Sequence, residues 1–153
     1  MPEPMSHDAH SYRNFAIELT IEFVIMYFVM YTMIDSTAHL HLNINNVYMT
    51  LMMVAPMAVV MLVSMRAMFR RTPVNTAIAA TSLVVFGLSF WAMRTQAAVG
   101  DRAFLRSMIP HHSGAILMCQ QASLSDPRII TLCQSIVESQ TSEIAQMEQL
   151  LAE

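Results

Sequence analysis

Long runs of apolar residues dominate the first two-thirds of the chain, and they predict three membrane-spanning helices. The runs cover residues 15–34, 47–69 and 74–93. Each is about as long as the 20 residues that a helix needs to cross a bilayer, at 1.5 Å per residue. Strand-like alternation is missing and the chain has three glycines. We therefore expect an all-α fold.

The last third of the chain changes to an amphipathic pattern that predicts a two-helix hairpin. Its helices are separated by the turn Ser123-Leu-Ser-Asp126-Pro127. Asp is favoured as a helix N-cap and Pro at the first helical position, so the second helix should begin here. The expected domains are a polar N-terminal tail (1–14), a three-helix transmembrane domain (15–93) and a hairpin (101–153).

Composition strengthens the membrane interpretation and excludes one class of partner. Of the 153 residues, 55% are hydrophobic and 12% are charged, against about 25% charged in soluble domains. The lipid bilayer is therefore the first expected partner. The net charge of -3 and the absence of lysine leave no basic surface for nucleic acid. Sixteen methionines raise the question of soft-metal chemistry.

One face of the first hairpin helix carries side chains that bind soft metal ions. At about 100° per residue, these side chains fall within an arc of about 120°. The candidate ligands on this face are Met108, His111, His112, Met118 and Cys119.

The second hairpin helix carries a matching set of donors within an arc of about 80°. These candidate ligands are Cys133, Gln140, Glu143 and Met147. Folding about the turn should place Cys119 near Cys133, the two histidines near Gln140, and Met108 near Glu143. Two faces rich in donors would then meet at matching heights.

The kinds of donor indicate which metal to expect. Thioether and thiolate sulfur together with imidazole suit Cu(I), and by the same reasoning Ag(I), whereas zinc is an alternative through histidine and cysteine. Single methionines such as Met118 and Met147, taken alone, are more typical of adaptable packing than of metal binding. The two cysteines have two readings: a pair of thiolate ligands, or a disulfide if the hairpin lies in an oxidising compartment.

The hairpin also resembles a known family. The residues that carry the resemblance are Asp101-x-x-Phe104, Met108-Ile-Pro-His-His-x-Gly114-Ala115, Met118, Asp126-Pro127, Ile136, Gln140, Glu143-Ile144 and Met147, together with the upstream segment Tyr48-Met-Thr-Leu-Met-Met-Val-Ala-Pro-Met57. They resemble family 305 among the bacterial domains of unknown function, in its membrane-anchored form. This resemblance implies a ferritin-like hairpin that self-associates and takes part in copper or silver binding and tolerance. Cys119 departs from the pattern, which has a small residue there.

Arginine positions predict the orientation in a bacterial inner membrane. Arg66, Arg70 and Arg71 flank the second loop, and the first loop has none. By the positive-inside rule, the N-terminus should be cytoplasmic and the hairpin extracytoplasmic. Three spans put His39 and His41 of the first loop on the same side as the hairpin. Two readings are open for these histidines: a second, weaker metal site or a point where metal enters, and simple placement in the headgroup region of the membrane.

Two carboxyl groups lie within the first apolar run. Glu18 and Glu22 are one helical turn apart, and ionised groups at that depth are costly unless they have a partner. We expect one of them to pair with Arg66.

The sequence thus predicts a membrane-anchored protein that binds Cu(I) or Ag(I) for buffering, handover or tolerance, without catalytic turnover. Two helices bury little surface, so a homodimer or higher homo-oligomer that completes a four-helix bundle is expected. A copper-handling protein would be a further partner. One rival is a ferritin-like oxidoreductase, although the hairpin lacks the Glu-x-x-His motif of di-iron bundles. The other is a methionine-rich scaffold that binds a partner helix.

Overall fold

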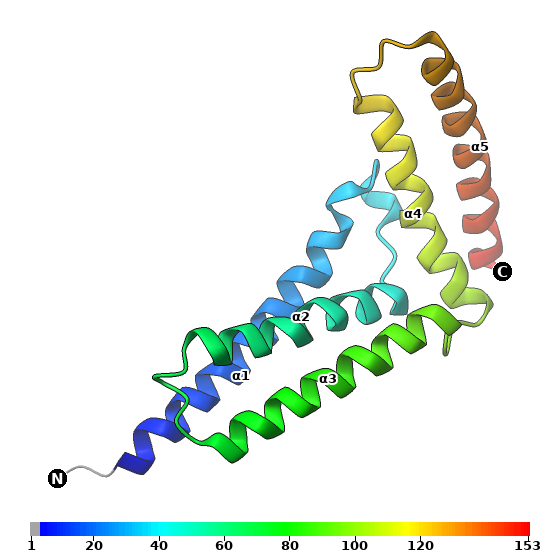
Figure 1. Ribbon diagram of the computed structural model, residues 1–153. Coiled ribbons are helices and arrows are strands. Elements are labelled where there is room, and N and C mark those ends of the chain that lie inside the picture. Colours follow the sequence, from blue (N-terminus) through cyan, green and yellow to red (C-terminus); the bar gives the residue numbers. More distant parts are fainter. Residues whose placement is uncertain (1–3) are drawn as a thin grey trace. The chain divides into compact units, whose positions relative to one another are not determined.

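The computed structural model describes residues 4–153, with side chains from residue 10 onward. Within this range it contains five α-helices, two short 3₁₀ helices and no strand, which confirms the all-α fold. In chain order the elements are α1 (Pro4–Val29), η1 (Met30–Met33), η2 (Thr37–His39), α2 (Ile44–Ser64), α3 (Thr72–Thr95), α4 (Asp101–Gln121) and α5 (Pro127–Ala152) (Figure 1).

Three helical segments are long and apolar enough to cross a membrane. They are His10–Met33, Ile44–Ser64 and Thr72–Thr95, which correspond to the three predicted spans. Their outward-facing side chains are also apolar; Val63 is 68% exposed and Leu83 is 73% exposed. A helix at the surface of a water-soluble protein turns polar side chains outward. The apolar exterior of these helices therefore suits a lipid environment.

The chain forms two compact units. The membrane-helix unit contains residues 4–28 and 47–97 of the described range, and the hairpin unit contains residues 29–46 and 98–153. Residues 29–46 thus belong with α4 and α5, although they lie within the three-helix domain expected from the sequence (15–93). The reason is a set of contacts between η1, η2 and α4, which are described with the site below.

The start of α1 differs from the sequence-based expectation. Residues 4–14 are helical, whereas the sequence predicted a separate polar tail over residues 1–14, of which residues 1–3 lie outside the described range. Tyr12 explains the difference, because its side chain belongs to the packed interior of the membrane-helix unit. Its hydroxyl donates to Asn75 Oδ1 over 2.7 Å, and its ring lies 5.2 Å from that of Phe69. These contacts anchor the first turns of the helix.

The expected ion pair within the membrane helices is not formed. Among residues 10–153, the ion pairs are His112–Glu143 and Arg128–Asp126, so neither Glu18 nor Glu22 pairs with Arg66. The register of α1 gives the reason. Tyr12 is level with the start of α3, and Glu18 lies six residues further along α1, or about 9 Å. Arg66 follows the end of α2 and is exposed, so it remains at the same end as Tyr12.

The hairpin unit is built on α4 and α5, which pack along an apolar seam. Ile109, Ile116, Ile144 and Met147 are its buried core, with Ile109 completely inaccessible. The buried residues of α4 recur at three- and four-residue intervals, as expected for one face of a helix. The turn also forms as predicted, since Asp126 caps α5 by accepting from the Arg128 backbone N–H over 2.9 Å and Pro127 begins the helix.

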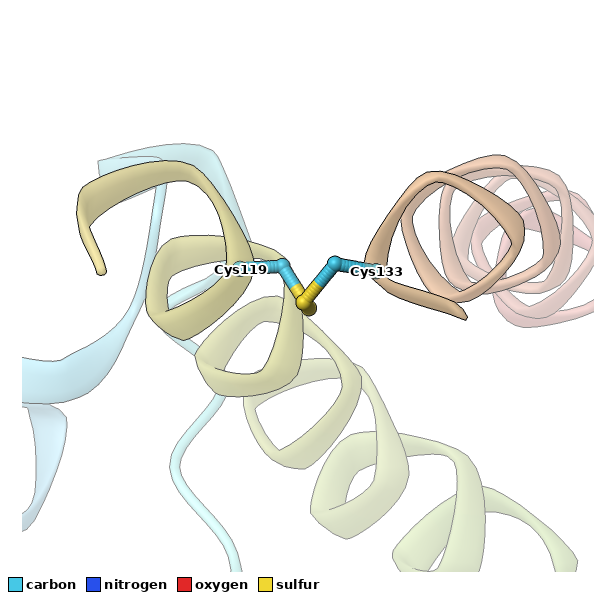
Figure 2. The surroundings of a disulfide bond; sticks show 2 residues. All are labelled: Cys119 and Cys133. Carbon is cyan, nitrogen blue, oxygen red and sulfur yellow. A yellow bond between two sulfur atoms is a disulfide. The ribbon is translucent and has the colours of Figure 1, made fainter. Parts of the chain in front are cut away.

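A disulfide between Cys119 and Cys133 links the two hairpin helices (Figure 2). The two Cα atoms are 5.3 Å apart, and the cysteines are separated by 14 positions in sequence. The expected meeting of these two side chains is therefore confirmed. The sequence left open whether these cysteines are two thiolate ligands or a disulfide, and in the structure they form the disulfide.

We predict that removing this disulfide destabilises the hairpin. Replacing Cys119 and Cys133 together by serine should lower the free energy of unfolding by about 3 kcal/mol, because a cross-link over a loop of roughly 15 residues restricts the unfolded chain by that amount. The measurement is thermal unfolding of the full-length protein in detergent, followed by circular dichroism. Dithiothreitol should lower the unfolding midpoint of the native protein by the same amount as the double substitution does. It should leave the midpoint of the serine variant unchanged. Equal midpoints for native and variant protein would contradict the prediction.

Candidate metal site in the hairpin

The side chains of His112 and Glu143 meet across the hairpin. His112 lies on the buried face of α4 and is 8% exposed, whereas the Glu143 side chain on α5 is 46% exposed. His112 Nε2 lies 2.8 Å from Glu143 Oε2. The sequence predicted that α4 histidines would face α5 donors, but it placed them opposite Gln140. The observed partner lies almost one turn further along α5.

Both nitrogens of the His112 ring have a hydrogen-bond partner. The ring Nδ1 lies 2.9 Å from the backbone carbonyl oxygen of Met108. Because a carbonyl oxygen can only accept, Nδ1 carries a proton and donates it. The second proton lies between Nε2 and the Glu143 carboxyl group. Glu143 is itself oriented by Ser139, whose hydroxyl donates to Oε1 over 3.0 Å.

This arrangement fits one requirement of a metal-binding histidine. Metal-bound histidines usually donate their other ring N–H to a carbonyl or carboxylate, which fixes the ring and its tautomer. The Met108 carbonyl does this for His112 and leaves Nε2 as the ligating atom. An ion bound there would replace the proton shared with Glu143, and the half-exposed carboxylate would offer a second ligand. His111 lies beside it, with ring centroids 5.9 Å apart.

The other candidate ligands are more dispersed. Met147 belongs to the buried core of the hairpin, as adaptable filler does. Met108 is half-buried and packs against that core. Met118 is 60% exposed, two turns beyond the histidines on α4. Gln140 is half-buried. Nowhere in the described chain do three or more His, Cys, Asp or Glu side chains form a group that could hold a metal ion.

The disulfide changes the expected set of ligands. Cys119 and Cys133 were candidate thiolate ligands, but their sulfur atoms are bonded to each other. A metal ion binds the thiolate form of cysteine, which a disulfide does not provide. With both cysteines oxidised, they leave the ligand set. The remaining donors are imidazole, carboxylate and thioether groups.

The loop that carries His39 contacts α4 next to His112. Ser113, which is fully buried, accepts a hydrogen bond at Oγ from the backbone N–H of Asp35 over 2.7 Å. The same oxygen lies 2.8 Å from His39 Nδ1. A methyl group added at Gly114 would come within 3.3 Å of the Met33 carbonyl oxygen. The expected proximity of this loop to the hairpin is therefore confirmed.

His41 lies in the same loop with one ring nitrogen unpaired. Its Nε2 is buried and has no hydrogen-bond partner. Burial lowers the pKa of His41 below its ordinary value; Arg106 and His39 act in the same direction, and Glu148 opposes them. The neutral ring, which is the form that binds metal ions, is therefore favoured at neutral pH. Arg106 and Glu148 are thus the hairpin residues whose charges act on His41.

Sequence reasoning missed Ser113, which joins the loop to the hairpin. It also missed the hydrogen bonds that shape the loop itself. Tyr31 donates from its hydroxyl to the His41 carbonyl over 2.8 Å, and the buried Asn43 amide donates to the Tyr31 hydroxyl over 3.1 Å. The available signal was Ser113 followed by Gly114, directly after the two histidines. A small polar residue next to a glycine permits close contact with another segment.

Comparison with known proteins places the hairpin in a family. The family model described as "Domain of unknown function (DUF305)" matches residues 89–151, which include α4 and nearly all of α5. The Uncharacterized protein L153 of Acanthamoeba polyphaga mimivirus is 36% identical to this chain over 121 residues, or 78% of each protein. That alignment is longer than the family match and so includes part of the membrane helices. No solved structure matches significantly. The protein is therefore a member of the DUF305 family.

Proposed function

We propose that this protein is a membrane-anchored metal-binding protein whose hairpin takes up Cu(I), or Ag(I), for buffering, handover or metal tolerance. The observation that supports this most directly is the environment of His112. Its Nδ1–H is held by the Met108 carbonyl, and its Nε2 is directed at a carboxylate. This is the arrangement of a histidine prepared to bind metal through Nε2.

The proposed binding step is an exchange of a proton for a metal ion. The proton shared by His112 and Glu143 is released when Nε2 becomes a ligand, as is usual when protein side chains bind metals. Glu143 then balances the charge of the cation. His111 is exposed and beside His112, so it is placed to receive the ion first. Met108, one turn earlier on α4, adds the soft thioether that favours Cu(I) and Ag(I), with zinc as the alternative.

The proposed location is a bacterial inner membrane, with the N-terminus in the cytoplasm and the hairpin outside. Two observations support this orientation. The turn between α2 and α3 carries three arginines at Arg66, Arg70 and Arg71, as cytoplasmic loops do. The hairpin carries a disulfide, which persists mainly in oxidising compartments. Both observations indicate the same side for the hairpin.

We further propose that the hairpin pairs with a second copy to form a four-helix bundle. The supporting observation is the apolar surface that the two helices leave uncovered. Leu132 is 58% exposed and Phe104 is 49% exposed, although both lie outside the segments long enough to cross a membrane. A homodimer would cover such side chains in the manner of a helical bundle. A copper-handling protein that delivers or accepts the ion is the proposed second partner.

We predict that His112 is the principal ligand. His112→Ala should lower Cu(I) affinity by more than the roughly 10- to 100-fold that follows loss of a supporting residue, and replacing both His111 and His112 should abolish high-affinity binding. Glu143→Gln should have an intermediate effect. Affinity is measured by competition with a chromogenic Cu(I) chelator, using the full-length protein in detergent.

A single-histidine change outside the hairpin provides the matched control. His10→Ala removes an exposed imidazole whose contact is with Arg13, and it should leave Cu(I) affinity unchanged. Circular dichroism should show equal helicity for all variants. Native affinity and stoichiometry in the double-histidine variant would refute the assignment. Elemental analysis of the purified protein distinguishes the rivals, because iron would favour an oxidoreductase and the absence of bound metal would favour a scaffold.

We also predict that the loop histidines contribute to metal uptake. Replacing His39 and His41 together by alanine should reduce metal stoichiometry or slow loading, because both imidazoles of the loop that contacts α4 are lost. His10→Ala is the matched control, since it removes an exposed imidazole outside the loop, whose contact is with Arg13, and it should leave loading unchanged. The measurement is metal mass analysis after stopped-flow loading. Equal rates and stoichiometry for native protein and the double-histidine variant would exclude the loop.

A further inference from the structure

The membrane-helix unit contains a cavity, open to its surroundings along exposed residues such as Ala16 and Ala77, that the proposed metal chemistry does not use. Its volume is about 630 Å³, and residues of α1, α2 and α3 line it. Sites for small molecules typically have volumes of about 300–1,000 Å³ and mostly apolar linings. This lining is apolar except for Thr81, Ser82 and the hydroxyl of Tyr12. The cavity therefore suits an apolar molecule or the apolar part of an amphipathic one.

Small side chains create this space. Ala16, Ala55, Ala58 and Ala77 line it from all three helices. Alanine at facing positions normally lets membrane helices approach closely. Here the alanines leave a gap beside an aromatic cluster, in which the Phe69 ring lies 5.2 Å from Tyr12 and 5.3 Å from Phe15. An empty gap forfeits dispersion contacts, and the acyl chain is the apolar group most abundant around membrane helices.

One end of the cavity is close to a cluster of arginines. Tyr12 and Pro73 line that end, and the Tyr12 hydroxyl accepts from the Arg71 backbone N–H over 3.2 Å. This contact places the end at the α2–α3 turn. Arg66 and Arg70 lie in this turn and are exposed. Basic residues at the ends of membrane helices bind the head groups of anionic lipids.

The apolar cavity and the arginine cluster together specify an amphipathic, anionic ligand. We propose that the membrane-helix unit binds one anionic glycerophospholipid, with an acyl chain in the cavity and the phosphate at the arginines of the α2–α3 turn. Charge complementarity selects this occupant over a zwitterionic lipid or a helix from a second copy. The site is independent of the hairpin and of any metal that the hairpin binds.

The test is native mass spectrometry of the full-length protein, released from micelles that contain phosphatidylglycerol or phosphatidylcholine with identical acyl chains. We expect one phosphatidylglycerol per chain, retained about tenfold more than phosphatidylcholine, as expected from attraction to one or two arginines. Equal retention of the two lipids would overturn the proposal, because it indicates non-specific lipid at the surface. A dimer that retains no lipid would also overturn it, because a second copy would then cover the cavity.

Two pairs of variants locate the lipid. Ala77→Phe fills the cavity and should abolish retention, whereas Ala80→Phe, on the same helix but outside the lining, should not. Arg66→Gln with Arg70→Gln should remove the preference for phosphatidylglycerol, whereas Arg94→Gln, near the other end of α3, should preserve it. If Ala77→Phe alters helicity, the smaller change Ala55→Leu serves instead. Native retention in the folded cavity variants, or an intact preference in the double-arginine variant, would refute the site.

Discussion

The hydroxyl group of Ser113 joins the two parts of the hairpin unit. It is fully buried, and it contacts both the Asp35 backbone N–H and the His39 ring. A buried hydroxyl must be hydrogen-bonded to avoid a large desolvation cost, so this contact fixes the loop on α4. Gly114 permits the approach by lacking a side chain where the Met33 carbonyl passes. The next residue towards the N-terminus is His112, and the loop therefore helps to fix the helix face that carries the candidate site.

The hairpin was the most predictable part of the fold. Its helices follow from apolar spacing, and its turn follows from the capping chemistry of Asp126 and the preference of Pro127 for a helix start. Register was less predictable. Counting from the turn correctly paired Cys119 with Cys133, yet it paired the histidines with Gln140 when His112 faces Glu143. A helix wheel gives the direction of each side chain, but the relative shift of two helices depends on how Ile109, Ile116, Ile144 and Met147 interlock.

Tertiary contacts explain the remaining errors. The polar residues at the start of α1 indicated a loose tail because the bonds of Tyr12 to Asn75 and of Arg71 to Tyr12 join residues about 60 positions apart. The predicted ion pair of Glu18 or Glu22 with Arg66 was wrong. The sequence shows that charged residues are present in or near the spans, but it does not show at which level of the neighbouring helix each of them lies. For the cysteines, the sequence left two outcomes open, since proximity alone is compatible with metal binding and with oxidation.

The disulfide makes the hairpin a closed covalent ring in addition to a packed pair of helices. Residues 119–133 form this ring, and the turn that joins α4 to α5 lies inside it. The turn is largely exposed, which is where peptide bonds are most accessible to proteases. A single cleavage in the turn would leave both helices covalently attached, with α5 still held opposite His112. The most vulnerable peptide bonds of the hairpin are thus the ones whose loss would disturb the candidate site least.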